Sequence, residues 1–465
     1  MHKNPGIFLS VLPLLFMALL LGVGYGIYKI SAEILLVLAA IFTGIIGKYL
    51  NYTWKEMEEG IVEVVRQALP AMFIVITVGM LISSWIASGT IPMLIYYGLD
   101  MINPSYFLLT ACVVCSFISI FTGTSWGTVG TVGVAFMGIA QGLGISLPAA
   151  AGAIISGAYF GDKLSPFSDT TNLAPVAAKS NLFDHIRHML WTTVPAWLLG
   201  LTVYFIVGHH AGNSIQSIIK IDTLQQGILT HFRFHLFLML PPVVVILFAV
   251  KKWPTIPGMI SAITLAVIGG WWIQELPLPS LLDILVKGYR IPSESQQLDM
   301  LLHRGGMMSM MGVTLIAFCA FAFAGIMQKT GMLEQILNSL LKWIKSTGSL
   351  IMSTALSSAT IALITGSSFL TILIPGELFS SVYRSRGLAA KNLSRTTEDS
   401  GTVIVPLIPW SMAGIFMAST LGVSTLSYLP WCIMNYSGII IAVIYGFTGI
   451  GIATKIRDDE TVPGS

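Results

Sequence analysis

Acidic side chains stand among apolar ones in two stretches of this 465-residue sequence. Asp162 and Asp169 lie in the first stretch, and Glu377, Glu398 and Asp399 lie in the second. Burial shifts a carboxyl group toward its neutral form, so a buried carboxylate can hold either a proton or a cation. Na⁺ is a hard cation and should prefer oxygen ligands. These residue types could therefore bind and exchange Na⁺ and H⁺, with Na⁺ expected at Asp162, Asp169 and Asp399.

Neutral oxygen donors and two basic side chains accompany these acids. Backbone carbonyls of interrupted helices would add further oxygen ligands. Lys163 and Arg395 could pair with the acids, or with the carboxylate of an organic substrate. The hydroxyl and amide side chains near the acids are those of Thr122, Thr124, Ser125, Thr170, Thr171, Asn172, Ser367, Ser368, Ser400 and Thr402.

Purely structural roles are the alternative for each acid. Asp162 could form an ion pair with the adjacent Lys163, and Asp169 could cap a helix that begins at Thr170. Glu398 and Asp399 could cap a helix in the same way, and Glu377 is best interpreted as a surface hairpin residue after Pro375-Gly376. His185 and His188 are interpreted as ordinary polar-edge residues, with pH sensing as the alternative.

The composition places these acids in a membrane protein. Hydrophobic residues make up 55 % of the chain and charged residues only 10 %, against about 25 % charged residues in soluble domains. Mean hydropathy is +0.82. The net charge of +3 is too small an excess of positive charge to indicate a nucleic-acid-binding protein. Five unpaired carboxylates at membrane depth would cost on the order of 12–17 kcal/mol, so they must be paired, hydrated, protonated or ion-bound.

Apolar stretches of bilayer-spanning length predict an all-α protein with about eleven or twelve transmembrane helices. YTWKEMEEGIVEVVRQ, residues 52–67, is too charged to span and is predicted to be a surface helix. Cys112 and Cys115 are interpreted as part of an apolar helix face, and Gly157 and Gly161 would permit close helix contact. The predicted spans are 7–28, 31–50, 70–88, 105–121, 146–160, 189–208, 234–250, 255–273, 307–327, 348–364, 401–422 and 428–452.

Residues 121–175 and 364–411 interrupt this pattern and resemble each other. Both are rich in Gly, Ser, Thr and Pro, and lipid cannot satisfy the free backbone groups of such sequence. TGTS at 122–125 corresponds to TGSS at 365–368, and each is followed by an apolar run, acids and a proline. We therefore predict a duplicated half: a first repeat at 1–208, connecting spans and polar loops at 209–306, and a second repeat core at 307–465.

These motifs resemble the NhaC-type Na⁺/H⁺ antiporter family. GDKLSPFSDTTNLAP at 161–175 and EDSGT at 398–402, followed by PLIPW at 406–410, carry the resemblance. It implies two inverted repeats, each with a re-entrant hairpin and a broken helix. TGTS and TGSS would be the hairpin tips. The family pattern would place Asn after the Pro-Trp pair, and here Ser411 stands in its place, so Ser411 is expected as a neutral ligand.

The resemblance implies a multi-pass exchanger of a prokaryotic inner membrane that binds Na⁺ and H⁺, needs no cofactor and could form a homodimer. The family also includes malate/lactate exchangers, so a small organic acid or an amino acid is the alternative cargo. An ion channel is a more distant alternative. No nucleotide-binding loop or hydrolase motif is found in the sequence, which predicts a gradient-driven transporter rather than an enzyme.

Overall fold

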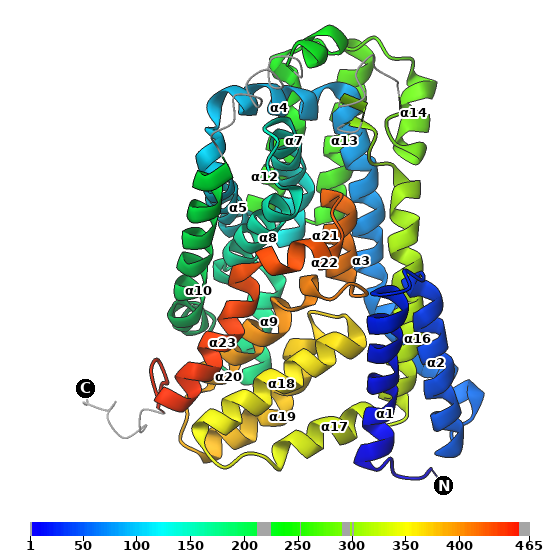
Figure 1. Cartoon of the computed structure of the whole chain (residues 1–465), viewed down its shortest axis with the longest axis vertical. Helices are drawn as coiled ribbons and strands as arrows, with labels where there is room; N and C mark the ends of the chain where they lie inside the picture. Colours follow the sequence, from blue (N-terminus) through cyan, green and yellow to red (C-terminus); the bar gives the residue numbers. More distant parts are fainter. Residues whose placement is uncertain (1, 212–224, 252, 291–297, 300–301, 455–465) are drawn as a thin grey trace, which may run out of the picture.

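Helices account for nearly all regular structure in the computed structural model, which describes residues 2–211, 225–251, 253–290, 298–299 and 302–454. The predicted all-α class is confirmed (Figure 1). The α-helices of the first half are α1 Ile7–Leu19, α2 Ala32–Tyr49, α3 Trp54–Ser88, α4 Thr90–Met101, α5 Phe107–Thr122, α6 Ser125–Thr128, α7 Val134–Gly142, α8 Leu147–Leu164, α9 Asp169–Ala178 and α10 Leu182–Ala211.

The rest of the chain continues in helices with short 3₁₀ and π turns between them. Among the described residues there are three π-helical stretches, η1 Leu20–Tyr25, η3 Val129–Gly133 and η6 Glu398–Thr402. The remaining α-helices are α12 Leu240–Val250, α13 Thr255–Trp272, α14 Leu278–Lys287, α16 Met311–Lys329, α17 Met332–Leu341, α18 Thr347–Thr365, α19 Leu370–Ser385, α20 Ala390–Thr397, α21 Met412–Leu421, α22 Thr425–Tyr428 and α23 Ile433–Thr448. The 3₁₀ turns are η2 Pro104–Tyr106, η4 Leu236–Met239, η5 Met307–Met310, η7 Val405–Leu407 and η8 Leu429–Trp431.

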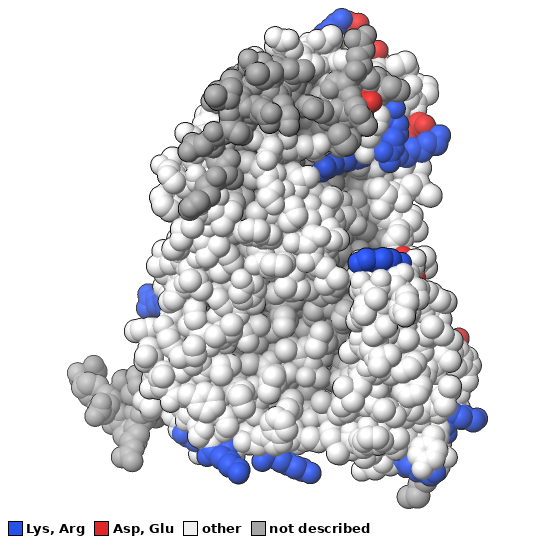
Figure 2. All heavy atoms as spheres, in the orientation of Figure 1, with Lys and Arg blue, Asp and Glu red and all other residues white. Residues whose placement is uncertain are grey.

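Seven helices in the described part of the chain are long and apolar enough to cross a membrane. The number rises to ten when each bent helix pair counts as one crossing. The prediction of eleven or twelve also counted shorter or more polar interior helices such as α8. On the face in Figure 2, charged side chains gather mostly toward the two ends of the molecule; a few lie at mid-height along its sides, and the broad central surface is uncharged. The protein is therefore a multi-pass membrane protein.

The charged segment 52–67 is helical from Trp54 and largely exposed, as predicted, but it is not an element separate from the next span. It forms the first part of α3, which continues without interruption through the predicted span 70–88. Thr53 caps the helix by accepting a hydrogen bond from the Glu56 backbone N–H. Pro70 lies inside the helix and does not end it. The polar connections predicted at 209–233 and 274–306 fall partly outside the described residues.

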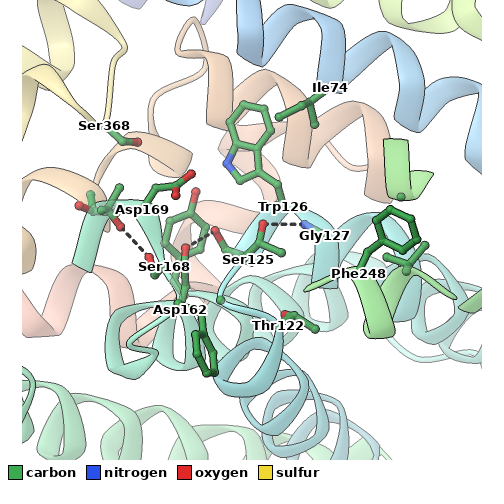
Figure 3. Close-up of a pocket in the computed structure, with 18 of the residues that line it drawn as sticks. Ile74, Thr122, Ser125, Trp126, Gly127, Asp162, Ser168, Asp169, Phe248 and Ser368 are labelled. Carbon is green, nitrogen blue, oxygen red and sulfur yellow. Dashed lines mark hydrogen bonds between the residues drawn. The ribbon is translucent and has the colours of Figure 1, made fainter. Parts of the chain in front are cut away.

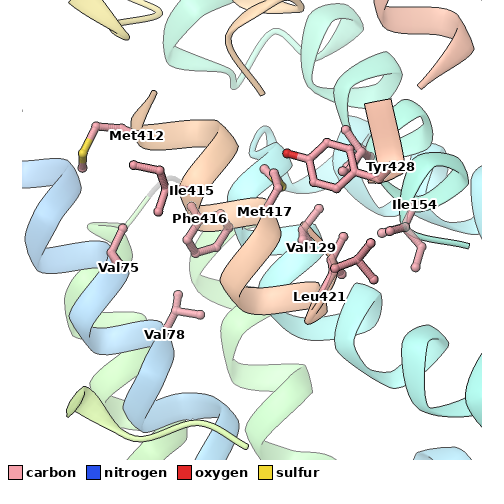
Figure 4. Packing of buried hydrophobic residues seen from close by; sticks show 14 of the residues in the cluster. Val75, Val78, Val129, Ile154, Met412, Ile415, Phe416, Met417, Leu421 and Tyr428 are labelled. Carbon is pink, nitrogen blue, oxygen red and sulfur yellow. The ribbon is translucent and has the colours of Figure 1, made fainter. Parts of the chain in front are cut away.

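A buried apolar cluster surrounds α21, which packs between α3 and the first-half elements η3 and α8 (Figure 4). Phe416 of α21 stacks on Trp126, with ring centroids 4.6 Å apart and planes 10° apart. Val75 and Val78 of α3 line the other side of the cluster. Because Trp126 directly follows Ser125, this stack fixes the first hairpin against the second half.

The two broken segments share the same local architecture. α5 and α18 end at Thr122 and Thr365, and each is followed by a glycine with left-handed φ, +67° at Gly123 and +61° at Gly366. In each half a serine then caps the next broken helix, Ser168 before α9 and Ser411 before α21. The two serines are 243 residues apart, as are the two hairpin threonines. The inverted relation of the halves and the boundaries at 208 and 306 stay predictions.

Candidate functional site

A cavity of about 390 Å³ lies where the two broken segments meet (Figure 3). Asp162 and Asp169 line it, together with hydroxyl groups from both halves. Its opposite wall is apolar and includes Phe248, Trp253 and Met259 from α12, α13 and the turn between them. The lining residues that had been predicted as site residues are Asp162, Asp169, Thr124, Ser125, Thr170 and Ser368.

The first hairpin delivers a hydroxyl group to the Asp162 carboxylate. Gly123 turns the chain after α5, and Thr124 caps the short helix α6 by accepting a hydrogen bond from the Gly127 N–H at 3.1 Å. Ser125, the first residue of α6, then donates from Oγ to Asp162 Oδ2 at 2.7 Å. A Cβ atom at Gly123 would lie 2.6 Å from the Phe167 Cβ, so only glycine fits this turn.

The start of α9 forms a second wall around the same carboxylate. Ser168 caps α9 and shares a 3.1 Å hydroxyl contact with Thr170. Thr171 donates from Oγ1 to the backbone carbonyl of Asp162 at 3.1 Å, which joins α9 to the end of α8. Asp169 occupies the first position of α9, where the helix dipole favours negative charge. Unlike Asp162, Asp169 is exposed.

Lys163 pairs with Asp399 rather than with its neighbour Asp162. Lys163 Nζ lies 2.5 Å from Asp399 Oδ1, with exposed side-chain fractions of 1 % and 0 %. The pair joins the end of α8 to η6 and so connects the two halves of the chain. Asp399 Oδ2 has no hydrogen-bond partner. Neither residue lines the cavity, and Lys163 pairs with Asp399 instead of forming the alternative ion pair with Asp162.

Glu398 is fully buried beside this pair, and neither of its carboxylate oxygens has a hydrogen-bond partner. Its carboxyl group lies close enough to Lys163 and Asp162 to interact electrostatically with both. Thr402, one turn further along η6, lines the cavity and also has an unpartnered hydroxyl oxygen. A buried polar group without a partner is costly, so Glu398 and Thr402 are placed to receive a ligand, a proton or water.

Four predicted ligands have other hydrogen-bonding roles and do not line the cavity. Asn172 is exposed and donates its amide to the carbonyls of Pro166 and Ser168. Ser400 of η6 donates to the Thr396 carbonyl of α20. Ser411 caps α21 and donates to the Val405 carbonyl, and the Ser367 hydroxyl accepts from the Leu370 N–H. Glu377 is exposed on α19 rather than in a hairpin turn.

Arg395 is buried on α20 but does not line the cavity. Within the described residues, no three His, Cys, Asp or Glu side chains come together as a metal-binding group. Asp162, Asp169 and Asp399 therefore do not share one three-carboxylate site in this conformation. A Na⁺ ion in the cavity would instead meet carboxylate oxygens mixed with hydroxyl and carbonyl oxygens, which suits a hard, singly charged cation.

Sequence reasoning missed several residues of the cavity. Tyr159 lines it one turn before Asp162, and its buried hydroxyl group has no hydrogen-bond partner. Its three-residue spacing from Asp162 on a helix could have revealed it. Trp126 and Ser168 lie within or beside the recognised motifs and could also have been included. Phe248 and Trp253 come from distant sequence and carried no such signal.

Comparisons with known proteins agree with this architecture. The profile of the Na⁺/H⁺ antiporter family matches residues 157–450, which include both acidic motifs. An uncharacterised Na⁺/H⁺ antiporter of Haemophilus influenzae is 46 % identical, with 95 % of this chain and 96 % of that protein covered. The Na⁺/H⁺ antiporter NhaC of Alkalihalophilus pseudofirmus is 37 % identical over 95 % and 96 % of the two chains.

A relative with a different named cargo also matches. The malate-2H⁺/Na⁺-lactate antiporter of Bacillus subtilis is 36 % identical, with 87 % of this chain and 86 % of that protein covered. Family profile and relatives together cover both broken segments and nearly the whole sequence. The chain therefore belongs to the Na⁺/H⁺ antiporter family.

Proposed function

We propose that this protein is a secondary antiporter that exchanges Na⁺, and also Li⁺, for H⁺ through carboxylates that bind either ion. The observation that carries this proposal is the Asp162 carboxylate, which receives the Ser125 hydroxyl at the wall of a cavity lined by both halves. Family membership supports the same conclusion. The transporter uses no nucleotide and no resident cofactor, because the ion gradients supply the driving force.

In this mechanism Asp162 and Asp169 bind a cation from the cavity and release their protons. Thr124, Ser125, Thr170 and Ser368 supply neutral oxygens around the cation. In this conformation the Lys163 ammonium group is paired with the Asp399 carboxylate. Movement of one half against the other would give Na⁺ access to Asp399 and Glu398 and then open the site to the opposite side.

Transport by purified protein in proteoliposomes tests the proposal. With an imposed Na⁺ gradient, the native protein should move protons, and Asp162→Asn should lose this activity because an amide cannot exchange a proton for a cation. The Asp169→Asn variant should lose Na⁺-driven proton movement for the same reason. Glu377→Gln is the matched control, since this exposed acid lies outside the cavity. Equal proton flux in Asp162→Asn and the native protein would overturn the assignment.

A second candidate is Na⁺/H⁺-coupled exchange of a small organic acid. Two observations favour it: the malate/lactate relative, and a cavity volume that falls within the range of small-molecule pockets, about 300–1,000 Å³. Ion flux should then depend on added malate, lactate or an amino acid. Flux that is unchanged across this panel would leave Na⁺ as the sole cargo.

Location in a prokaryotic inner membrane and assembly as a homodimer belong to the same proposal. Crosslinking in native membranes tests the dimer.

Recordings in planar bilayers test the channel alternative, which requires single-molecule currents, whereas a carrier gives slow, saturable and counter-ion-dependent flux.

A further inference from the structure

Residues 449–454, which follow α23, lie against α20 in a short extended pairing. The Ala389 N–H donates to the Ala453 carbonyl at 3.0 Å, and Leu388 and Thr454 form an antiparallel bridge. Asn392 holds both polar groups of Ala453: its amide donates to the Ala453 carbonyl at 2.6 Å, and its Oδ1 accepts from the Ala453 N–H at 2.9 Å. We call residues 449–454 the C-terminal clasp.

The clasp also provides the hydrogen-bond partner of a buried cation. Arg395 Nη1 donates to the Gly451 carbonyl at 2.7 Å, whereas Arg395 Nε and Nη2 have no hydrogen-bond partner. The residue is 0 % exposed. A guanidinium group has five donors in a fixed planar arrangement and is expensive to bury unsatisfied. Arg395 is therefore held in a position that leaves much of its binding capacity unused.

A complementary group lies one turn away. Asp399 follows Arg395 by four residues, a separation that brings side chains together on a helix, and the two charges interact electrostatically. Asp399 Oδ2 has no hydrogen-bond partner, although Oδ1 contacts Lys163. An unpartnered guanidinium edge and an unpartnered carboxylate oxygen thus lie on neighbouring turns of one continuous helical segment.

Helix α20 is also held by α10. His185 Nδ1 lies 2.9 Å from Ser394 Oγ, and His188 Nε2 lies 3.0 Å from Asn392 Oδ1. Both histidines are buried, so their interpretation as polar-edge residues is wrong. The His185–Ser394 contact does not involve the clasp, so we expect it to hold α20 in place when the clasp leaves while Arg395 reorients.

We propose that the C-terminal clasp holds Arg395 away from Asp399, and that its release inhibits exchange by letting Arg395 pair with this carboxylate. Bound to Asp399, the guanidinium group would compete with Na⁺ for a carboxylate that the proposed function assigns to ion binding. Arg395 is thus a positioning residue for the second-half acids. Release raises the Na⁺ concentration needed for exchange and leaves the fold intact.

Two truncated chains separate the clasp from the tail beyond it. A chain that ends at Thr454 retains every clasp contact and is the matched control for a chain that ends at Thr448. In proteoliposomes, we expect the chain ending at Thr448 to show a Na⁺ KM raised at least tenfold, with kcat changed much less. The same Na⁺ KM in the two truncated chains would overturn the proposal.

Rescue distinguishes inhibition by Arg395 from simple loss of packing. Arg395→Gln in the chain ending at Thr448 removes the competing charge and should return the Na⁺ KM to within about threefold of the control. Arg395→Lys in the same chain keeps a positive charge at this position, so the Na⁺ KM should stay close to its raised value. A truncated chain that keeps its native melting temperature but is not rescued by Arg395→Gln would contradict the proposal.

A full-length variant covers the case in which the truncated chain does not fold. Gly451 has a φ of +60°, and a Cβ atom there would lie 3.1 Å from Trp191 and 3.4 Å from Arg395 Nη1. Gly451→Val should displace the clasp and raise the Na⁺ KM. Gly144→Val, at a φ of +69° with open space around it, reproduces the backbone strain away from the clasp. Equal Na⁺ KM values in these variants would overturn the proposal.

Failure of the proposed function gives a different result. Asp399→Asn in the chain ending at Thr454 tests whether this carboxylate takes part in exchange at all. If Asp399→Asn abolishes exchange but removal of the clasp does not change the Na⁺ KM, the clasp proposal is rejected and the proposed function stands. Full exchange in Asp399→Asn rejects the site assignment on which the clasp depends.

Discussion

Lys163 and Asp399 show how far burial changes the importance of one ion pair. The surface pairs Arg66–Glu63 and Lys287–Asp283 are largely exposed, and pairs of this kind contribute about 0–1 kcal/mol. Lys163 and Asp399 are 1 % and 0 % exposed, and removing one partner of such a buried pair costs about 3–5 kcal/mol. A cation that displaces Lys163 must therefore provide a comparable interaction with Asp399.

A double-mutant cycle measures this coupling. Lys163→Met should lower the unfolding free energy by about 3–5 kcal/mol, because Asp399 is left charged and unpaired. The double variant Lys163→Met/Asp399→Asn should lose less unfolding free energy than the sum of the losses in the two single variants. Denaturant unfolding of the purified protein in detergent gives the three values. Strict additivity would show that the two groups do not depend on each other.

Ser411 provides a second prediction, because its hydroxyl group caps α21 instead of facing the cavity. Ser411→Ala should cost about 1 kcal/mol of unfolding free energy through the lost cap, with the Na⁺ KM unchanged. Ser424→Ala is the matched control, since Ser424 is exposed and makes no cap hydrogen bond. A raised Na⁺ KM at native stability would instead identify Ser411 as an ion ligand.

At this scale the sequence predicted residue types better than partners. Lys163 was recognised as a charge partner, but its pairing with Asp399 depends on how α8 meets η6, which no spacing along the chain encodes. Asn172 has the right chemistry for an ion ligand. Its amide binds the carbonyls of Pro166 and Ser168, and the Ser168 carbonyl also accepts from the Asn172 backbone N–H, so the side chain is held in the turn before α9.

At the scale of elements, close packing of α5 against α8 positions Asp162. A Cβ atom at Gly157 would lie 2.2 Å from the Cys112 carbonyl oxygen, and one at Gly161 would lie 2.3 Å from that of Ser116. Both glycines therefore allow direct backbone contact between the two helices. The close contact predicted from the sequence is confirmed, and Cys112 belongs to the buried helix face.

Substitution at this contact should move α8 and its carboxylate. Gly157→Ala must displace backbone atoms of α5, so we expect a lower melting temperature and reduced Na⁺-driven proton flux. Gly438→Ala is the control, because Gly438 lies within α23 and a Cβ atom added there would have no neighbouring atom within 4 Å. That substitution should be neutral or stabilise by up to about 1 kcal/mol. Equal melting temperatures of the two variants would contradict the role of Gly157.

Local motifs predicted the hairpins better than they predicted helix lengths. Both TGTS and TGSS mark a left-handed glycine after a long helix, as a turn signal in apolar sequence indicates. The α3 helix was divided incorrectly at 67, because its charged first turns and apolar later turns differ in composition but share one backbone. Helices α4 and α19 were not predicted as separate elements, since each is short or interrupted by polar residues.

At the scale of the whole molecule, cavity access can be followed with an introduced thiol. Cys112, Cys115 and Cys432 are buried, so a protein in which Ser replaces Cys319 should show little reaction of its native thiols with the reagent. Ser368→Cys should react with a membrane-impermeant thiol reagent from one side of the bilayer, and Na⁺ should slow the reaction by filling the cavity. Ser357→Cys, on fully buried α18 surface, is the control and should not react.

Reaction of Ser368→Cys from both sides at equal rates would contradict alternating access and favour the channel alternative. Reaction that is unaffected by Na⁺ would show that the cation binds outside this cavity. These two outcomes separate the path of the ion from the place where it binds, and transport rates alone do not provide that distinction.

The unequal surroundings of the two broken segments have a consequence for the transport cycle. The first segment exposes Asp169 to the cavity, whereas Glu398 and Asp399 are buried within α20 and η6, where Thr402 reaches the cavity wall. The two corresponding segments therefore differ in how much of their acidic side chains the cavity reaches. If the two segments exchanged surroundings during transport, Asp169 would become enclosed while Glu398 and Asp399 became accessible, so the two carboxylate groups would open in alternation.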